Sequence, residues 1–518
     1  MKNKIIFYIK KAWAPTIVVT VIFLIEYFFF GMGNTMIAPF AALTFLRVHQ
    51  MKHDYSCLVK NFSVYIIMVC LAAVALLNVW LCVIVNALAL FWIAYLLIDE
   101  FVPNNYFTAG MALIFFQISP VTLDSPKELL MRIGGLIAAF LVIAAFLCLL
   151  RLLNKIIQKP KMDEIFQLIQ DGMALCECLC DLFNSESFDI KEIRKYQQEL
   201  CKINRQLCQN LYMQNRSSLE MEVRDNKYCA YVALFQTAGH MVSEDENQNT
   251  IQRKAVQLRD LLKDYDTSVE HLPEEVSHKL HIRTNRLDIR SFRLRFALRQ
   301  VCIIMPCLVF AYVSGWPNSY WLTISVFFMM IPLYERTSGR IAQRMTGTFA
   351  GLMLCVVLFA VFKGVPERIV LMTIFNFLIY CAQSYASTVT FITGSALALN
   401  FVEENYLVML GQRLIYTIVG AAIAWVANTW VFPIRAKRQM TFIREILEEI
   451  QNDVKTALKL PRAERICEIN RLIILSYMLG MRMDDLNSTL PKNQQDKTIA
   501  KALQAHMRML AGLIKEKL

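Results

Sequence analysis

Two long apolar stretches, at about 13–150 and 296–432, constrain this chain more than any other feature. A helix needs about 20 apolar residues to cross the hydrocarbon core of a bilayer, and each stretch is long enough for several such helices. Of the 518 residues, 56% are hydrophobic and 19% are charged, whereas a soluble domain has about 25% charged residues. The sequence from about 151 to 295 and the tail from 436 hold much of the charge. This alternation predicts two membrane regions, each followed by a soluble region.

The apolar stretches divide into six candidate spans each. In the first half these are 13–30, 34–47, 58–77, 79–98, 105–120 and 129–151, and in the second 296–314, 319–333, 341–362, 367–383, 386–401 and 411–432. The second span of each half is brief, so five spans per half is the alternative. The fold class we expect is an all-α membrane protein with two six-helix transmembrane repeats. We divide it into a membrane repeat at 1–152, a helical domain at 153–290, a membrane repeat at 291–435 and a helical domain at 436–518.

Positive charge next to the spans predicts the orientation. Basic residues gather before the first span and after the second and eighth, whereas acidic residues prevail at the other ends. Because basic residues are enriched in cytoplasmic loops, the N-terminus and both soluble domains should be cytoplasmic. The soluble domains should be helical, with helices expected at 190–214, 219–242, 247–269, 440–458, 462–483 and 496–517. The 3.6-residue apolar period and the intervening prolines support this expectation.

The net charge of +12 does not indicate nucleic-acid binding, because no such motif accompanies it. The basic segment Arg283–Arg299 is interpreted as a positive-inside anchor ahead of the seventh span. An amphipathic helix that meets anionic lipid or an anionic substrate is the alternative. The 15 cysteines are scattered and lack zinc-site spacing, so we expect reduced thiols, no metal and no cofactor. No paired nucleophile and base are found, so an enzyme is not expected.

The two apolar stretches look duplicated. A shift of about 284 residues pairs four positions of the first stretch with the same residue type in the second, and Asn34 falls on Asn318. The four are Phe107 with Phe391, Gly110 with Gly394, Ala112 with Ala396 and Leu113 with Leu397. The same shift places Lys60 on Arg344, and a slightly smaller one places Arg132 on Arg413. Repeats with an even span count share one orientation and are related by an axis along the membrane normal.

The second half carries the sharpest motifs. They are Trp-Pro-x-x-x-Trp-Leu-Thr from Trp316, Arg-x-x-Gly-Thr-x-x-Gly from Arg344, and Gly-Gln-Arg ending at Arg413 with a later Pro433. Gly347 and Gly351 of the second motif form one helix face that permits close backbone contact.

These motifs and the layout resemble the fusaric acid resistance or aromatic acid exporter family. This family is distantly similar to plant aluminium-activated malate transporters. The resemblance implies export of organic anions, especially aromatic carboxylates, with proton coupling. It also implies a bacterial inner membrane protein that corresponds to a fused dimer of six-span subunits. The first half departs from the pattern, with Lys60 where the second half has Arg344.

Cations near the ends of spans are the candidates for an anion path. Arg132 and Arg413 should lie near the outer face, and Lys60 and Arg344 near the inner face. An arginine inside a span costs at least about 2.5 kcal/mol by insertion scales, so it normally faces protein or water. The alternative is that each arginine extends to lipid headgroups. Further path candidates are Arg340, Asn318, Thr390 and Thr393, although hydroxyls in spans also join helices.

Glu26 lies within the first span, and an intramembrane carboxyl group is a candidate for proton coupling. The alternative is an acid that is hydrogen-bonded within the bundle.

We therefore expect a transporter that exports organic anions, with no catalytic residues. A passive anion channel and a non-transporting membrane scaffold are the alternatives. The expected partners are the lipid bilayer and a small organic anion, with a periplasmic adaptor if the cell is Gram-negative. The oligomeric state, whether a fused pseudo-dimer or a homo-oligomer, is left open.

Overall fold

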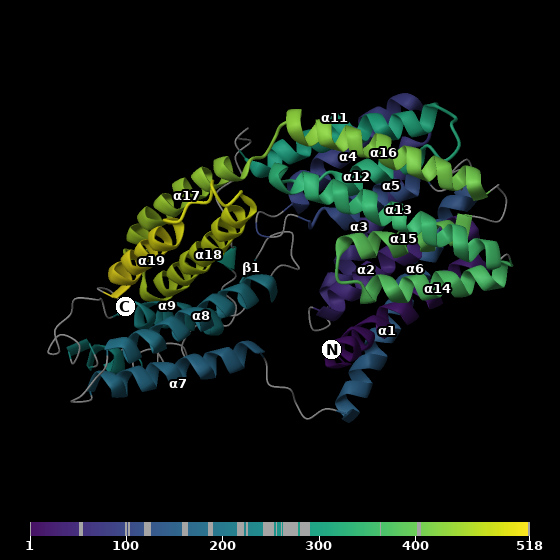
Figure 1. Cartoon of the computed structure of the whole chain (residues 1–518). Coiled ribbons are helices and arrows are strands. Elements are labelled where there is room, and N and C mark those ends of the chain that lie inside the picture. The colour runs from purple at the N-terminus through teal and green to yellow at the C-terminus, as the bar shows by residue number, and fades with distance from the viewer. Residues whose placement is uncertain are drawn as a thin grey trace. The chain divides into compact units, whose positions relative to one another are not determined.

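The computed structural model of the chain forms two compact units. The membrane unit comprises Met1–Ile157 with Asp288–Arg435, and the helical unit comprises Gln158–Leu287 with Ala436–Leu518. Figure 1 shows the helices of both. The structure describes residues 2–50, 55–98, 101, 104–118, 126–157, 164–184, 190–214, 222–223, 226–241, 253–254, 256–260, 262, 278–279, 291–362, 364–400 and 406–515.

Each apolar stretch folds into a series of helices. The first half contains α1 (Lys2–Ile25), the π-helical turn η1 (Glu26–Phe30), the 3-10 turn η2 (Met32–Asn34), α2 (Ile37–Gln50), α3 (Tyr55–Ala75), α4 (Val79–Leu97), α5 (Phe107–Ile118) and α6 (Pro126–Ile157). The second half contains α11 (Phe292–Val313), α12 (Tyr320–Met329), the 3-10 turn η4 (Tyr334–Arg336), α13 (Thr337–Val361), α14 (Val365–Cys381), α15 (Tyr385–Asn400) and α16 (Tyr406–Trp430).

The chain is a multi-pass membrane protein. Within the described residues, seven helical segments are long and apolar enough to cross a bilayer. They are Ala12–Phe30, Leu58–Ala75, Val79–Leu97, Lys127–Leu152, Phe292–Val313, Tyr334–Val361 and Leu407–Trp430. The other five predicted spans correspond to the shorter helices α2, α5, α12, α14 and α15.

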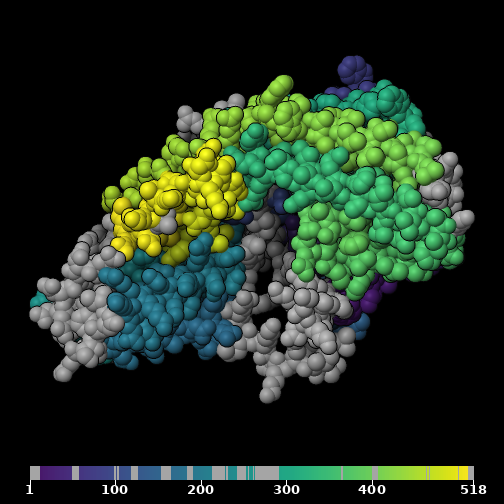
Figure 2. All heavy atoms as spheres, in the orientation of Figure 1, coloured from purple at the N-terminus to yellow at the C-terminus, as the bar shows by residue number. Residues whose placement is uncertain are grey.

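The outward faces of these helices are apolar. Trp80 is 78% exposed, Phe29 is 76% exposed and Val357 is 64% exposed. Apolar exposure on this scale would be unfavourable in water and suits contact with lipid chains. The second half forms much of the membrane-unit surface that Figure 2 shows in green.

The two halves meet through reciprocal pairs of helices. α11 of the second half packs along α4 of the first, and α1 of the first half packs along α14 of the second. Figure 1 shows α11 beside α4. Aromatic rings fill a further contact between the halves, where Phe107 of α5 stacks on Phe327 of α12 with 5.4 Å between ring centroids. The membrane halves therefore form one packed body.

The helical unit contains α7 (Glu164–Asn184), α8 (Ile190–Gln214), α9 (Asn226–Gly239), α17 (Ala436–Ala457), α18 (Arg462–Thr489) and α19 (Ile499–Lys515). The helices predicted at 190–214, 440–458, 462–483 and 496–517 are confirmed, with shifts of up to six residues at their ends. The helix predicted at 219–242 is shorter, since α9 covers only Asn226–Gly239, and most of the one predicted at 247–269 lies outside the described residues. One departure from the all-helical prediction is an antiparallel pair of two-residue strands, β1 (Glu222–Val223) and β2 (His278–Lys279). On α17 the buried residues Ile443, Leu447, Ile450 and Val454 recur every three or four positions and form its core-facing stripe.

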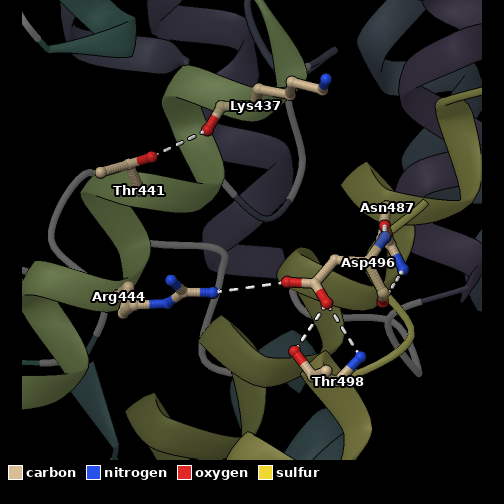
Figure 3. Close-up of polar contacts among 6 residues, drawn as sticks. All are labelled: Lys437, Thr441, Arg444, Asn487, Asp496 and Thr498. Atoms are coloured by element: carbon tan, nitrogen blue, oxygen red, sulfur yellow. Dashed lines mark hydrogen bonds and ion pairs between the residues drawn. The ribbon is translucent and has the colours of Figure 1, made fainter. Parts of the chain in front are cut away.

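Asp496 fixes the loop between α18 and α19, as Figure 3 shows. Its backbone N–H donates to the Asn487 side chain at 2.9 Å, and its carbonyl accepts from the same side chain at 3.0 Å. Its carboxylate accepts from the N–H and hydroxyl of Thr498 and forms an ion pair with Arg444. These contacts tie α17 and the end of α18 to the start of α19.

Candidate functional site

A row of arginines leads into α13 from its N-terminal end. Arg336 precedes the helix, and Arg340 and Arg344 follow at intervals of four residues, which places them on one helix face. Their exposure falls along the row, because Arg336 is exposed, Arg340 is half-buried and Arg344 is only 1% exposed. The sequence thus carries positive charge from the end of the helix into the protein interior.

Arg344 is a buried cation whose hydrogen-bonding capacity is largely unused. Its Nε and Nη1 atoms are buried and have no hydrogen-bond partner among the described residues. Its guanidinium carbon lies 4.8 Å from the centroid of the Phe328 ring. A cation–π contact replaces only part of the hydration that a buried guanidinium loses. Arg344 is therefore a buried cation whose Nε and Nη1 donors are unused among the described residues.

Arg413, from α16, presents a second cation near the first. It is 4% exposed and its guanidinium carbon lies 5.1 Å from the Trp321 ring. The positive charge of Arg344 repels that of Arg413. Trp321 and Phe328 lie seven residues apart on α12, which places them about two turns apart on one face. The two arginines therefore lie against the same face of α12.

Three buried hydroxyl groups lie on α13 and on two helices that pack against it. Ser325 of α12, Thr348 of α13 and Thr393 of α15 each bury a hydroxyl oxygen that has no hydrogen-bond partner among the described residues. The helices α12, α15 and α16 all pack on α13. We call Arg344, Arg413 and these three residues the second-half polar cluster. Its unused donors and acceptors lie inside the bundle, where unsatisfied polar groups are costly.

The predicted glycine face of α13 is confirmed and faces α15. A Cβ atom at Gly347 would overlap the carbonyl oxygen of Ala386, and one at Gly351 would lie 2.7 Å from the carbonyl oxygen of Thr390. Only glycine permits this backbone approach. The close contact brings Thr393 against α13, since its Cβ atom would lie 2.9 Å from a Cβ atom at Gly351.

The other predicted path residues of the second half already have partners. Arg340 donates from Nε to the carbonyl of Phe328 at 3.3 Å, and its guanidinium carbon lies 3.2 Å from the Tyr385 ring centroid. Thr390 donates to the carbonyl of Ala386 in its own helix at 3.1 Å. Asn318 donates to the side chain of Gln412 at 2.9 Å. Of Arg340, Thr390 and Asn318, only Arg340 is a cation, and it lies between Arg336 and Arg344 in the row that leads into α13.

In the first half, Arg132 of α6 donates from Nε and Nη1, whereas its buried Nη2 has no hydrogen-bond partner among the described residues. Arg132 is 1% exposed, and its Nη1 donates to the carbonyl of Phe116 at 2.8 Å. Its Nε donates to the side-chain carbonyl of Asn34 at 3.3 Å. Lys60 lies half-buried on α3, outside the second-half polar cluster. Arg132, Arg344 and Arg413 are all buried within the bundle, so the alternative of extension to headgroups does not describe them.

Glu26 begins the π-helical turn η1 and is completely buried. Neither carboxylate oxygen has a hydrogen-bond partner among the described residues. The alternative of a hydrogen-bonded acid therefore does not fit the described part of the chain.

Arg299 does not lie at the membrane surface, as the prediction of a positive-inside anchor at 283–299 would require. It is completely buried in α11 and donates to the carbonyls of Ile331, Pro332, Val431 and Phe432 and to the side chain of Asn428. It thus joins the break between α12 and α13 to the end of α16. Its place inside the apolar stretch that starts at 296 was the signal for a buried role.

Comparison with known proteins places the similarity in the second half. Residues 306–427 match the family model described as fusaric acid resistance protein-like. The matched region contains the whole second-half polar cluster, whereas Arg299, Arg132 and Glu26 lie outside it. No solved structure matches the chain.

Curated relatives match over limited lengths. The inner membrane protein YccS of Escherichia coli is 27% identical over 146 residues, which are 28% of this chain and 20% of that protein. The uncharacterized protein YhfK of Escherichia coli is 27% identical over 184 residues, 35% of this chain and 25% of that protein. The uncharacterized protein ORF2 of Neisseria gonorrhoeae is 24% identical over 151 residues, 29% of this chain and 36% of that protein. The chain thus spans about a third or less of the length of these relatives.

Proposed function

We propose that this membrane protein, whose second half is similar to fusaric acid resistance proteins, exports organic anions through the second-half polar cluster. Aromatic carboxylates are the proposed substrates, and the proton gradient is the proposed driving force. The observation that carries the proposal is Arg344, a cation only 1% exposed whose Nε and Nη1 have no hydrogen-bond partner among the described residues. A buried guanidinium without such partners is costly unless an anion binds it.

A carboxylate suits this cluster on electrostatic grounds. Arg344 and Arg413 repel each other, and an anion that lies between them would replace this repulsion by two attractions. Guanidinium and carboxylate groups also match in geometry and form charge-assisted hydrogen bonds. The hydroxyls of Ser325, Thr348 and Thr393 provide further donors in the same group of helices.

The aromatic rings that lie beside the cations support an aromatic substrate. Tyr385, Phe328 and Trp321 lie against Arg340, Arg344 and Arg413 respectively. An aromatic acid can present its carboxylate to a guanidinium while its ring packs on these side chains. An aliphatic acid of similar size lacks that second contact and is expected to bind more weakly.

We further propose that the two halves are related six-helix repeats that form a fused pseudo-dimer. The reciprocal contacts of α11 with α4 and of α1 with α14 support this relation, because a two-fold operation exchanges the partners. Equivalent contacts within the halves, α3 with α5 and α13 with α15, support it as well. In this arrangement the N-terminus and the soluble domains are cytoplasmic, and the row from Arg336 to Arg344 begins at the cytoplasmic end. Anions then enter at Arg336 and leave past Arg413.

Transport by purified protein in liposomes tests the proposal. Liposomes are loaded with radiolabelled benzoate, 4-hydroxybenzoate or malate, and flux is measured with and without a pH gradient. We expect gradient-dependent flux of the aromatic acids, reduced about tenfold or more in Arg344→Ala, since lost charge-assisted hydrogen bonds cost about 1.5–3 kcal/mol. Gln343→Ala, an exposed neighbour on α13, is the matched control. Flux that ignores the pH gradient indicates a channel, and no flux of any acid overturns the proposal.

A further inference from the structure

A second buried charge lies in the first half, apart from the second-half polar cluster. Glu26 is completely buried in the π-helical turn η1, and neither carboxylate oxygen has a hydrogen-bond partner among the described residues. An ionised carboxylate in such surroundings is costly, whereas the protonated acid is far less so. A π-helical turn within an α-helix is also frequent at functional sites. The arrangement suits a group that gains and loses a proton.

Among the described residues, no ion pair explains the burial of Glu26. The elements that pack on η1 are α1, α6 and η2. The described titratable side chains on these elements and on η1 itself are Tyr27, Lys127, Glu128, Arg132, Cys148 and Arg151. Arg132 lies one helical turn from Gly135, which contacts Glu26, but its Nε and Nη1 donate to Asn34 and to the Phe116 carbonyl, and no ion pair with Glu26 is present among the described side chains. Within the described part of the chain, Glu26 is thus held without a salt bridge.

Gly135 provides the space for the carboxyl group. A Cβ atom at this position would overlap Oε2 of Glu26. Gly134, the preceding residue, contacts the Phe30 ring in the same way, with 3.0 Å between a Cβ atom and the ring. The Gly-Gly pair of α6 therefore fits the π-helical turn closely, and Gly135 is the position that admits Glu26.

Direct helix contacts connect Glu26 to the second-half polar cluster. η1 continues α1, α1 packs along α14, α14 packs along α15, and α15 packs along α13, which carries Arg344. The α14–α15 contact is tight, since a Cβ atom at Gly394 would lie 2.8 Å from the Phe375 ring. Three packed interfaces thus lie between η1 and the helix that carries Arg344.

We propose that Glu26 carries the coupling proton, so that the first half binds the proton while the second half binds the anion. This inference rests on the proposed function. In each cycle a proton from water on the outer face forms an O–H bond with the Glu26 carboxylate. That bond breaks toward the cytoplasm, and one proton moves inward as one anion moves outward. Gly135 is a positioning residue that keeps the site open.

Glu26→Gln separates this inference from the proposed function. Glutamine is similar in size to glutamic acid and cannot release a proton at this position. Two measurements are made in liposomes with labelled 4-hydroxybenzoate, namely accumulation driven by a pH gradient and counterflow against unlabelled substrate without a gradient. We expect Glu26→Gln to lose gradient-driven accumulation at least tenfold and to keep counterflow within about twofold of wild type, because exchange needs no net proton movement.

The outcomes distinguish the two ideas. Wild-type protein without counterflow or accumulation overturns the proposed function. Wild-type transport with normal gradient-driven accumulation in Glu26→Gln overturns the role of Glu26 alone. Loss of both activities in Glu26→Gln also contradicts a specific coupling role, provided that the variant elutes as wild type on size exclusion. Glu367→Gln is the matched control, because Glu367 is a carboxyl group that caps α14 by accepting from the Gly364 N–H. Liposomes with this variant should accumulate labelled 4-hydroxybenzoate as wild type does.

Gly135→Ala gives a second, independent readout. The added methyl group should displace the Glu26 carboxyl group and reduce gradient-driven accumulation more than counterflow. Gly411→Ala on α16 is the control, because a Cβ atom there meets no other group within 4 Å. Equal loss of accumulation and counterflow in Gly135→Ala would point to a general packing defect and would count against the positioning role.

Discussion

Arg132 donates from Nε to the side-chain carbonyl of Asn34, 98 positions earlier in the chain, over 3.3 Å. In the second half, the asparagine at the matching position, Asn318, instead bonds Gln412, the neighbour of Arg413. One asparagine thus holds the arginine of its half, whereas the other holds the residue beside it. Arg413 itself lies against the Trp321 ring, whereas Arg132 donates to Asn34 and to the Phe116 carbonyl and keeps its buried Nη2 without a partner among the described residues.

This difference predicts opposite effects of two matched substitutions. Arg413→Ala should reduce anion flux about tenfold or more, with little change in the unfolding temperature, since it removes a contact of the proposed substrate and relieves repulsion by Arg344. Arg132→Ala should lower the unfolding temperature, since it leaves the Phe116 carbonyl without its donor. Liposome flux and thermal unfolding in detergent measure the two effects. Equal loss of flux without loss of stability in both variants would contradict the distinction.

Arg299 should be among the most important side chains for stability of the membrane unit. Arg299→Ala removes donors from four backbone carbonyls and from Asn428, and we expect a loss of about 3–5 kcal/mol in the free energy of unfolding. Arg299→Lys should retain only part of this free energy of unfolding, because an ammonium group lacks the planar fork of donors that a guanidinium presents. Thermal unfolding in detergent is the measurement, and Arg336→Ala, an exposed arginine, is the control. Similar unfolding temperatures for the two alanine variants would contradict this prediction.

The α13–α15 contact should be sensitive to one methyl group. In Gly351→Ala the new Cβ atom would lie 2.7 Å from the Thr390 carbonyl, and separating the helices should cost about 1–3 kcal/mol. Gly339→Ala on the same helix meets nothing within 4 Å and should be neutral or stabilising by up to about 1 kcal/mol. Unfolding temperature and anion flux should both fall in the first variant. If neither the unfolding temperature nor the anion flux falls in Gly351→Ala, then α13 and α15 can move apart without cost.

His506 of α19 predicts acid sensitivity of the helical unit. Its imidazole is 7% exposed, contacts Gln451 at 3.0 Å, and burial lowers its pKa from 6.5 to about 4. As the pH falls from 6.5 toward 4 the unfolded chain gains a proton that the folded chain resists, so stability falls through this window. The loss by pH 4 should be roughly 3 kcal/mol at about 1.4 kcal/mol per pKa unit.

Hydrogen exchange of α19 amides, corrected for the intrinsic effect of pH, measures this loss. His506→Gln should flatten most of the dependence between pH 7 and pH 4. Burial also lowers the pKa of His240 in the same unit, so a smaller slope of the same sign should persist. An unchanged slope in His506→Gln would assign the acid sensitivity to other groups.

Patterns in the sequence predicted the parts of the fold that depend on local chemistry. Long apolar stretches predicted membrane helices, and the 3.6-residue period of 190–214 predicted α8. The Gly347 and Gly351 face predicted close helix contact, because glycine spacing on a helix fixes which side lacks side chains. The arginines of the anion-path hypothesis were also found from sequence, since charge inside an apolar stretch is rare enough to be noticed.

Only the tertiary structure decided which of those charges have partners. Arg299, Arg132 and Arg344 look alike in sequence, each being an arginine near one end of an apolar helix. Arg299 meets the carbonyls of residues up to 133 positions away, and Arg132 meets Asn34. Arg344 meets the Phe328 ring, and its Nε and Nη1 have no hydrogen-bond partner among the described residues. The reason is physical, because hydrogen-bond partners of a buried side chain come from other helices and depend on distances that the sequence of one helix does not contain.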